Sequence, residues 1–207
     1  MTMRQTEFVV RVIAETAIEN EKYFGDLDSV VGDGDFGYSL ARGFEKLLEG
    51  WDDLDRTNPG TFLRKCGIVI TSRIGGTSGP IWGTGFLRAG AAAGDATELT
   101  AGQVVAMLRA AIEGIKARGQ SDVGDKTLLD ALVPMTDALA SGGLPAAAVA
   151  AREAADATVD MVAKRGRAAY TGERSRGSVD AGAMAVAVIV ERINEAWNET
   201  GNQEAGA

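Results

Sequence analysis

Three aspartates lie within eight residues in the first part of the chain, at Asp28, Asp33 and Asp35. Carboxylates held this close repel one another unless a proton or a cation lies between them. Ligand sets made only of oxygen suit Mg²⁺ or Ca²⁺ rather than zinc. The glycines between and after the aspartates let the backbone turn all three side chains toward one point. The segment therefore predicts a site for a hard cation.

Two other interpretations of this segment have to be weighed. One is a glycine-rich turn in which the Asp side chains cap backbone amides, because Asp-Gly pairs are common in turns. The other is the dinucleotide-binding pattern G-x-G-x-x-G, which Gly32, Gly34 and Gly37 match. We reject the second, because only Val30-Val31 precedes the glycines in place of a strand and two carboxylates lie between them. An acidic loop needs a metal before it can approach phosphate.

The composition is that of an acidic globular protein. The 207 residues are 45% hydrophobic and carry a net charge of −8, so we expect one domain, residues 1–207, with a sizeable core. The negative charge argues against broad binding to nucleic acid or to anionic membranes. No leader pattern and no apolar run of about 18 residues is evident, which predicts a cytoplasmic protein that does not bind a membrane.

Cysteine and histidine usage narrows the chemistry. The single cysteine, Cys66, lies in an apolar run, so we expect a buried thiol and no intrachain disulfide. Histidine is absent, which excludes imidazole as a general base, nucleophile or metal ligand. Any acid–base chemistry in this chain therefore depends on carboxylates.

The periodicity of apolar residues predicts an all-α fold. Spacings of three and four alternate along most of the chain, and few segments alternate as strands do. The β-branched run at residues 66–72 is the weakest helical prediction, because it also fits a strand. Helices are expected near residues 5–24, 38–51, 59–74, 79–93, 100–118, 126–141, 145–164 and 181–198.

Two glycine-rich connectors precede helical segments. In Gly75-Gly-Thr-Ser-Gly-Pro80, free amides and the hydroxyls of Thr77 and Ser78 fit an anion site, although this connector taken by itself slightly favours a simple N-cap by Ser78. The second, Gly124-Asp-Lys-Thr127, resembles the end of a phosphate-binding P-loop, but Asp125 separates the glycine from the lysine. The spacing of that motif therefore fails, and we do not interpret it as one.

A third connector, residues 164–182, is basic in an otherwise acidic chain. Arg165, Arg167, Arg174 and Arg176 could neutralise a phosphorylated ligand through bidentate contacts, or could belong to a solvated loop. Taken with the acidic loop and the other two connectors, this pattern favours a metal–nucleotide site at one end of a helical bundle.

These motifs together resemble the nucleotide-binding L subunit of dihydroxyacetone kinase, also called the DhaL or Dak phosphatase domain. The resemblance covers nearly the whole chain, and its motifs occur in the family's order and approximate spacing. They are Asp28 followed by Gly32-Asp-Gly-Asp-Phe-Gly37, then Gly75-Gly-Thr-Ser-Gly-Pro80, Gly124-Asp-Lys-Thr127, and Gly166-Arg-Ala-Ala-Tyr-Thr-Gly-Glu-Arg-Ser-Arg-Gly177 followed by Asp180.

The resemblance implies an eight-helix antiparallel barrel that holds ADP or ATP through two Mg²⁺ ions at one end. It implies that Asp28, Asp33 and Asp35 are the metal ligands. It also implies that Tyr38 and Ser39 border the phosphates, and that Gly119 and Leu128 form part of the adenine wall. The full set of nucleotide contacts that it implies is Gly37, Tyr38, Ser39, Gly76, Thr77, Ser78, Gly119, Thr127, Leu128, Arg167, Asp180 and Gly182.

The family resemblance also implies a division of labour. The ketose is bound by a histidine of a separate K subunit, so this chain would supply the nucleotide and metal but no catalytic nucleophile. The chain departs from the family pattern at Phe36, where many members have a histidine, and at Tyr38-Ser39. This departure leaves open whether the ketose is dihydroxyacetone or a longer one such as erythrulose.

Several alternatives remain open at this level. ADP could be a fixed cofactor that a phosphotransferase-system phosphocarrier rephosphorylates, or ATP could exchange freely as a substrate. The chain could instead be a non-catalytic nucleotide-binding module that signals to a regulatory partner. A stand-alone phosphatase is the least favoured alternative, because no general base is evident near the motifs.

Overall fold

The computed structural model describes residues 1–73, 76 and 78–205. Across this part of the chain the secondary structure is helical, with no strand, as the periodicity predicts. Residues 66–72 are helical as well. The α-helices are α1 (Met3–Glu19), α2 (Glu21–Ser29), α3 (Phe36–Glu49), α4 (Pro59–Arg73), α5 (Ser78–Ala93), α6 (Ala101–Gly119), α7 (Leu129–Ala157) and α8 (Ala181–Ala205). Short 3₁₀ segments are η1 (Trp51–Asp53), η2 (Thr158–Asp160) and η3 (Arg167–Ser175).

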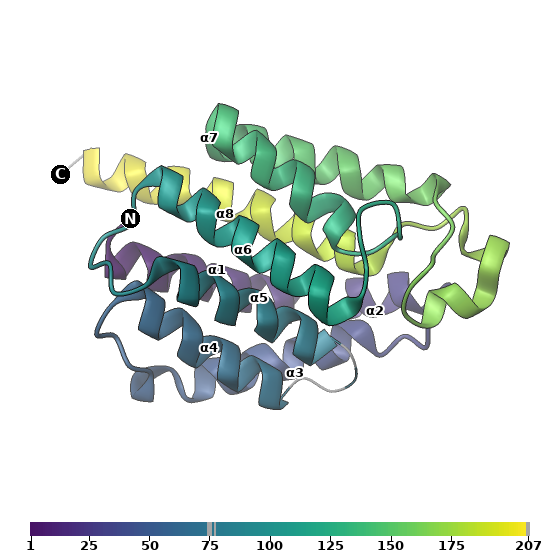
Figure 1. Ribbon diagram of the computed structural model, residues 1–207, viewed down its shortest axis with the longest axis horizontal. Helices are drawn as coiled ribbons and strands as arrows, with labels where there is room; N and C mark the ends of the chain where they lie inside the picture. The colour runs from purple at the N-terminus through teal and green to yellow at the C-terminus, as the bar shows by residue number, and fades with distance from the viewer. Residues whose placement is uncertain (74–75, 77, 206–207) are drawn as a thin grey trace.

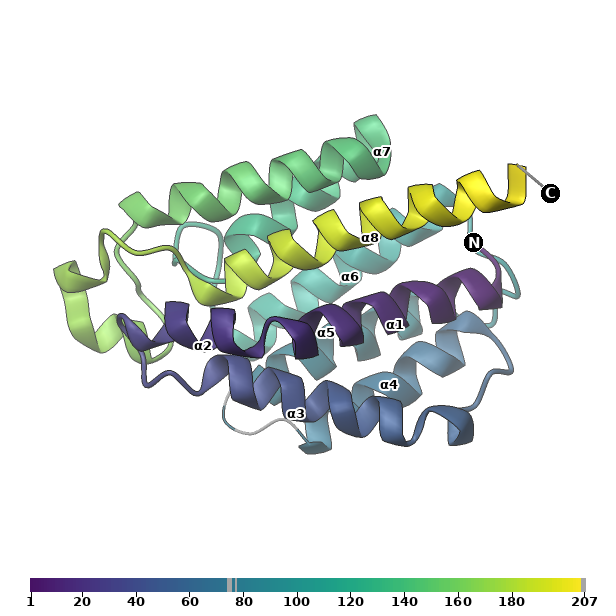
Figure 2. The same ribbon diagram turned by 180° about the vertical axis from the view of Figure 1, so that it is seen from behind.

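The helices close into a ring. Along it α1 packs on α3, α3 on α4, α4 on α5, α5 on α6, α6 on α7, α7 on α8, and α8 again on α1. Both chain termini lie at one end of the ring, and η3 lies at the opposite end together with the start of α8 (Figures 1 and 2). With the two arms of α7 counted separately and α2 extending α1, this is the predicted eight-helix antiparallel barrel.

Helix α7 consists of two arms. Gly143 breaks it with φ 75° and ψ −169°, a conformation that residues with a Cβ rarely adopt. Pro145 follows at the start of the second arm, where its missing N–H costs nothing. The arms run back along one another (Figure 1). The break predicted between residues 141 and 145 is therefore confirmed.

Three predicted helix boundaries are wrong. The helix expected at 5–24 is two helices, because Asn20 leaves the helical conformation and its side-chain amide donates to the Thr16 carbonyl at 2.9 Å. The helix expected from residue 126 begins at Leu129, because Lys126 has a positive φ of 61°. The helix expected to reach residue 164 ends at Ala157, where a 3₁₀ turn replaces it.

The core fills the ring with aliphatic and aromatic side chains. Phe24, Phe44 and Phe62 are fully buried, and Cys66 is buried beside them, as its apolar run predicts. Burial raises the pKa of the Cys66 thiol to about 12, which leaves it unreactive. A cavity of about 740 Å³ remains among apolar side chains inside the ring, and none of the three clustered aspartates is among its lining residues.

Helix α7 is also the longest apolar segment. Residues 129–160 contain an 18-residue window of mean hydropathy 1.2, so by length and composition the segment qualifies as a membrane span, which the sequence analysis did not expect. The turn at Gly143 divides it into arms that are each shorter than the roughly 20 residues needed to cross a bilayer. Helix α7 packs on α6 and α8 in the barrel wall, and 22% of the apolar window is buried there.

Helices α4 and α5 approach one another through glycines. A Cβ on Gly60 would lie 2.2 Å from the Gly94 carbonyl oxygen and 2.8 Å from that of Gly90. A Cβ on Gly90 would in turn lie 2.7 Å from the Gly60 carbonyl oxygen. These atoms are backbone and cannot move without separating the helices, so side chains at these positions would open the barrel wall.

The α4–α5 contact can be tested with Gly60→Ala. We expect this change to lower the free energy of unfolding by about 1–3 kcal/mol, as overpacking does. Gly102→Ala is the matched control, because Gly102 is also the second residue of its helix and a Cβ there would meet nothing within 4 Å. The control should gain up to about 1 kcal/mol from helix propensity. Urea unfolding measures both, and equal stability of the two variants would contradict the proposed close packing.

Candidate functional site

The three aspartates of the first motif converge. Asp28 lies in the last turn of α2, and Asp33 and Asp35 lie in the loop that leads to α3. Each offers a carboxylate oxygen, and these oxygens lie within 4.8 Å of one another. Asp33 and Asp35 are exposed and Asp28 is half-buried, so the cluster opens to solvent. The arrangement offers an oxygen-only ligand set of the kind that hard divalent cations take.

The backbone of the loop holds this convergence. Gly34 has φ 75°, and a Cβ on Gly32 would lie 2.2 Å from a carboxylate oxygen of Asp28. The Phe36 amide at the start of α3 donates to the other Asp28 oxygen at 3.4 Å. Asp28 thus also satisfies one free amide of the α3 N-terminus, where the helix dipole favours negative charge. Both roles of the aspartates, capping and clustering, are present.

Electrostatics show the cost of this convergence. Burial, followed by repulsion from Asp33, raises the pKa of Asp35, and only Arg167 acts strongly in the other direction. The Arg167 guanidinium lies 2.5 Å from Asp33 and 3.9 Å from Asp35. Within the described part of the chain, Arg167 is therefore the arginine of the basic connector whose guanidinium reaches these carboxylates.

The first turn of α3 lies directly beside the cluster. Gly37 is buried against α2, and a Cβ there would lie 2.0 Å from the Glu21 carbonyl oxygen. Tyr38 is 59% exposed, and the Arg42 guanidinium lies 5.3 Å from its ring centre. The Ser39 amide donates to the Asp35 carbonyl at 2.9 Å, so Ser39 sits one turn from the carboxylates.

Phe36 points into the protein. It packs on the main core, with its ring centre 6.2 Å from that of the fully buried Phe24. A histidine at this position would have to place its imidazole in the same apolar surroundings or turn outward. The residue that departs from the family pattern therefore contributes to packing.

The glycine-rich connector before α5 is only partly described. Gly76 is exposed with φ 63°, and Ser78 is the first residue of α5. Gly75 and Thr77 lie outside the described residues, so the predicted anion contact at Thr77 has no structural counterpart here. Helices α3, α5 and α8 all begin at the end of the barrel that carries η3 (Figures 1 and 2).

The residues predicted for the adenine wall come from facing elements. Gly119 ends α6, and a Cβ on it would lie 3.2 Å from the Ile81 side chain of α5. Leu128 lies just before α7, and a Cβ on Gly182 of α8 would lie 3.4 Å from the Leu128 Cβ. Leu128 and Gly182, far apart in sequence, are therefore neighbours.

Asp180 and Thr127 both form hydrogen bonds at the starts of helices. One Asp180 carboxylate oxygen accepts the Ala183 amide at 2.7 Å and so caps α8. The residue is partly exposed, yet desolvation of its carboxyl group raises the pKa to about 7, and Asp130 adds to the rise. The Thr127 amide donates to Asp130 at 2.7 Å, and the Thr127 hydroxyl accepts the Leu129 amide at 3.2 Å.

Two other arginines of the basic connector, Arg165 and Arg176, contact groups outside the carboxylate cluster. Arg165 lies 3.4 Å from Asp125, and Arg176 lies 3.3 Å from Glu173 and donates to the Asp160 carbonyl. Arg165, Arg167 and Arg176 of the predicted arginine cluster therefore have separate partners: the Arg176 contacts lie within the connector, and Arg165 joins it to the loop between α6 and α7.

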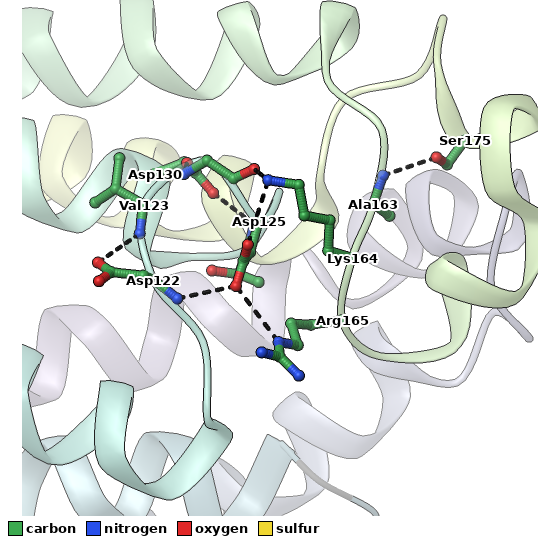
Figure 3. A network of polar contacts seen from close by, with 10 residues as sticks. Asp122, Val123, Asp125, Asp130, Ala163, Lys164, Arg165 and Ser175 are labelled. Carbon is green, nitrogen blue, oxygen red and sulfur yellow. Dashed lines mark hydrogen bonds and ion pairs between the residues drawn. The ribbon is translucent and has the colours of Figure 1, made fainter.

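Sequence reasoning missed the residues that join the two long loops. Asp125 accepts the Asp122 amide at 3.1 Å and pairs with Lys164 and Arg165, while Asp130 accepts the Gly124 amide at 2.5 Å (Figure 3). Lys126, in the same loop, is buried. The Gly124-Asp-Lys-Thr127 motif was the available signal, but a local motif does not indicate which groups of a distant loop its side chains contact.

Comparison with known proteins identifies a family and a fold. The family model of the DAK2 domain matches residues 30–195. The chain is 35% identical over 187 residues to the PEP-dependent dihydroxyacetone kinase ADP-binding subunit DhaL of Escherichia coli K12, covering 86% of this chain and 89% of that protein. It is also 35% identical to the L-erythrulose 1-kinase of Mycolicibacterium smegmatis, covering 90% of this chain and 34% of that protein.

A solved structure shares the fold. The dihydroxyacetone kinase of C. freundii, in complex with AMP-PNP and Mg²⁺, superposes with a TM-score of 0.77 and 27% identity. The match covers 93% of this chain and 34% of that one, so the chain spans about a third of the larger kinase.

Removal of one clustered charge tests the metal site. Asp35→Asn relieves repulsion, so without divalent cations we expect it to be at least as stable as the wild type. With Mg²⁺ at about 100 times its dissociation constant the wild type should gain about 2.7 kcal/mol, and the variant far less. Asp26→Asn, on the same helix as Asp28 but outside the cluster, should respond to Mg²⁺ as the wild type does. Thermal unfolding with Mg²⁺ and with EDTA measures this, and equal gains in all three proteins would contradict a metal site.

Asp180 predicts an unusual pH dependence of stability. Its folded pKa of about 7 lies above the ordinary value of 3.8, so its contribution to stability is present at low pH and lost as pH rises through 7. With no histidine in the chain, few other side chains change charge between about pH 5 and pH 8. Metal-free wild type should lose stability between about pH 4 and pH 7, at a slope approaching about 1.4 kcal/mol per pH unit, and the loss should level off above pH 7. Asp180→Asn should flatten the profile measured by urea unfolding, and an unchanged profile would exclude Asp180 as its source.

Proposed function

The chain belongs to the DAK2 domain family, and we propose that it is the nucleotide-binding subunit of a ketose kinase. In this proposal residues 1–207 form one domain that binds ADP or ATP with Mg²⁺. The phosphoryl group passes to a hydroxyl of a ketose that is bound on a separate K subunit. The observation that carries the proposal is the convergence of three carboxylates at the end of the barrel where α3, α5 and α8 begin.

The donor set fits the proposed metal. Asp28, Asp33 and Asp35 would hold Mg²⁺, in two ions on the family pattern, because carboxylate oxygens are the ligands that hard cations prefer. The raised pKa of Asp35, which burial and then repulsion from Asp33 cause, supports this fit, because a cation would favour the charged carboxylate. When bound, Mg²⁺ would screen the β and γ phosphates and spread the charge of the transferring group.

The protein groups would position and neutralise the nucleotide. Phosphates are assigned to the first turn of α3 at Gly37, Tyr38 and Ser39, and to Gly76, Thr77 and Ser78 before and at the start of α5, because helix N-termini favour anions. Arg167 would supply a guanidinium close to the metal ligands. Gly119, Thr127 and Leu128 are assigned to the base side, with Asp180 and Gly182 closing the site. No residue is assigned as a nucleophile.

Exposed apolar side chains support a partner at this end. Val30 is 64% exposed and Tyr170 is 91% exposed, and Tyr38 and Val123 are also exposed. Val30 lies between α2 and α3, Tyr170 in η3 and Val123 between α6 and α7, so all border the proposed site. A K subunit docking here would cover them and bring the ketose hydroxyl to the nucleotide. Neither nucleic acid nor a membrane is proposed as a partner, and the proposed location is the cytoplasm.

The nucleotide and ketose specificities are inferred from the relatives. PEP dependence in the name of the E. coli relative supports ADP as a tightly held cofactor that a phosphocarrier rephosphorylates. The erythrulose kinase of M. smegmatis supports a longer ketose as an alternative to dihydroxyacetone. The inward packing of Phe36 favours neither ketose, because its ring faces the core rather than the mouth.

Calorimetric titration with ADP and ATP tests the binding part of the proposal. We expect binding that requires Mg²⁺ and that falls at least 10- to 100-fold in Asp33→Ala, since each ligand carboxylate contributes to holding the metal. Asp26→Asn is the control on the adjacent helix. If wild-type protein binds neither nucleotide, the kinase-subunit proposal is wrong.

Turnover with a K subunit tests the transfer part. The chain alone should bind nucleotide without phosphorylating dihydroxyacetone or erythrulose, and should phosphorylate one of them when the K subunit is added. Retention of ADP through gel filtration, with rephosphorylation by a phosphocarrier, would identify the cofactor mode, and free exchange with ATP the substrate mode. Hydrolysis of ATP by the isolated chain would favour a phosphatase, and nucleotide binding with no turnover in any mixture would favour a regulatory module.

A further inference from the structure

Lys126 is a buried lysine in the loop between α6 and α7. Lys126 is 2% exposed. Its ammonium donates to the backbone carbonyls of Met161 at 3.1 Å, Ser178 at 2.7 Å and Ser175. An ammonium has three donors, so all of them are used. Among the described residues it forms no ion pair with a carboxylate within 4.0 Å, which means that carbonyl dipoles alone make its direct contacts.

The three carbonyls belong to one connector, residues 158–180, which joins α7 to α8. Met161 precedes η3, Ser175 is its last residue and Ser178 follows it, so Lys126 holds the connector on both sides of η3. Arg167, which pairs with Asp33, lies between these contacts in the chain. Asp180 ends the connector and caps α8. One side chain from a different loop therefore fixes the segment that carries two proposed nucleotide residues.

Other contacts between the two loops are more exposed. The Lys164 amide donates to the Asp125 carbonyl at 3.0 Å, and the Lys164 ammonium donates to the Gly124 carbonyl at 2.8 Å (Figure 3). The Lys164 side chain is 62% exposed, and contacts of this kind contribute little because water competes for them. The Lys126 contacts are largely buried, so loss of the ammonium would remove a donor from all three carbonyls, of which, in the described part of the chain, only that of Ser175 keeps another, the Ser178 hydroxyl at 3.3 Å.

The same geometry excludes Lys126 as a phosphate ligand in this conformation. A lysine that follows glycine before a helix would reach a nucleotide phosphate in a P-loop, but here its donors are already taken by carbonyls. Its positive φ of 61° turns the side chain toward the connector and ends the possibility of an earlier helix start. The conformation is one that a residue with a Cβ adopts only when its surroundings over-determine it.

We propose that Lys126 is a positioning residue, which holds the connector so that Arg167 faces the carboxylate cluster and Asp180 stays at the start of α8. This inference rests on the proposed nucleotide site, and it assigns Lys126 no contact with the nucleotide. Lys126 acts through its three carbonyl contacts, so a neutral side chain of similar length loses the effect even where the barrel stays folded. Arg167 is the residue through which the effect on binding is transmitted.

A double-mutant cycle on Mg²⁺-ADP binding tests the proposal. The variants are Lys126→Met, Arg167→Met and the two combined, with Lys164→Met as the matched control from the same pair of loops. We expect Lys126→Met to weaken binding roughly 10- to 100-fold. In the Arg167→Met background the same change should cost much less, because the residue being positioned is gone. The proposal would be overturned if the fold-losses in affinity of the two single variants multiply in the double variant, or if Lys126→Met binds Mg²⁺-ADP as tightly as the wild type.

A milder variant and a second measurement keep the test decisive. Lys126→Gln retains two donors, so its affinity for Mg²⁺-ADP should lie between those of the wild type and Lys126→Met. If the Met variant does not fold, the Gln variant replaces it in the double-mutant cycle. Hydrogen exchange should show faster exchange in residues 161–178 with the rest of the barrel unchanged. Uniformly faster exchange across the barrel would mean a general stability role and would overturn the proposal.

The two proposals fail in different ways. If the wild type binds Mg²⁺-ADP and Lys126→Met binds it equally well, the positioning role is wrong and the proposed function stands. If the wild type does not bind nucleotide, the proposed function is wrong, and Lys126 as a positioning residue for a nucleotide site is overturned with it. Local exchange in residues 161–178 then reports only whether Lys126 holds the connector.

Discussion

Carboxylates whose oxygens lie within 4.8 Å of one another repel, and the end of the barrel around Asp28, Asp33 and Asp35 supplies positive charge against that repulsion. The N-terminus of α3 contributes an amide to Asp28, and Arg167 contributes a guanidinium to Asp33. These sources come from different parts of the chain. The cluster can therefore exist only when the α2–α3 loop and the α7–α8 connector are both in place, which ties the local motif to the closed fold.

The barrel meets that condition through its topology. Antiparallel packing brings the starts of α3, α5 and α8 to one end, so amide-rich helix starts and the carboxylate loop share a surface. Glycine contacts between α4 and α5 keep the wall narrow at the side that carries α5. At the mouth, the loop between α6 and α7 holds the long connector through the buried Lys126, and the more exposed ion pairs of Asp125 add little. Rigid helices thus set the distances, and a small number of buried polar contacts set the loops.

Patterns that act within one segment were predictable from the sequence. The helical period gave the all-α fold, and the spacing of Asp28, Asp33 and Asp35 gave the cluster. The division of the first predicted helix at Asn20 depends on one side-chain contact that periodicity does not register. The role of Lys126 depends on carbonyls 35 to 52 residues away, and the placement of Phe36 depends on a ring from another helix. Long-range contacts of this kind carry no signal in a local pattern, whereas the family resemblance supplied site assignments that the residues alone left open.

The pairing of Arg167 with Asp33 has a consequence for the proposed function. A cation bound to the carboxylates would replace the guanidinium as their counter-charge, and Arg167 would then be available to a phosphate. Conversely, a phosphate that attracts Arg167 leaves the carboxylates in greater need of a cation. Each ligand would therefore raise the affinity for the other, and linkage requires the two effects to be equal. The acidic loop would therefore select its ligand as well as bind it. Without the metal the loop repels the phosphates of a nucleotide, and with the metal it holds them. The nucleotide would consequently enter as its Mg²⁺ complex.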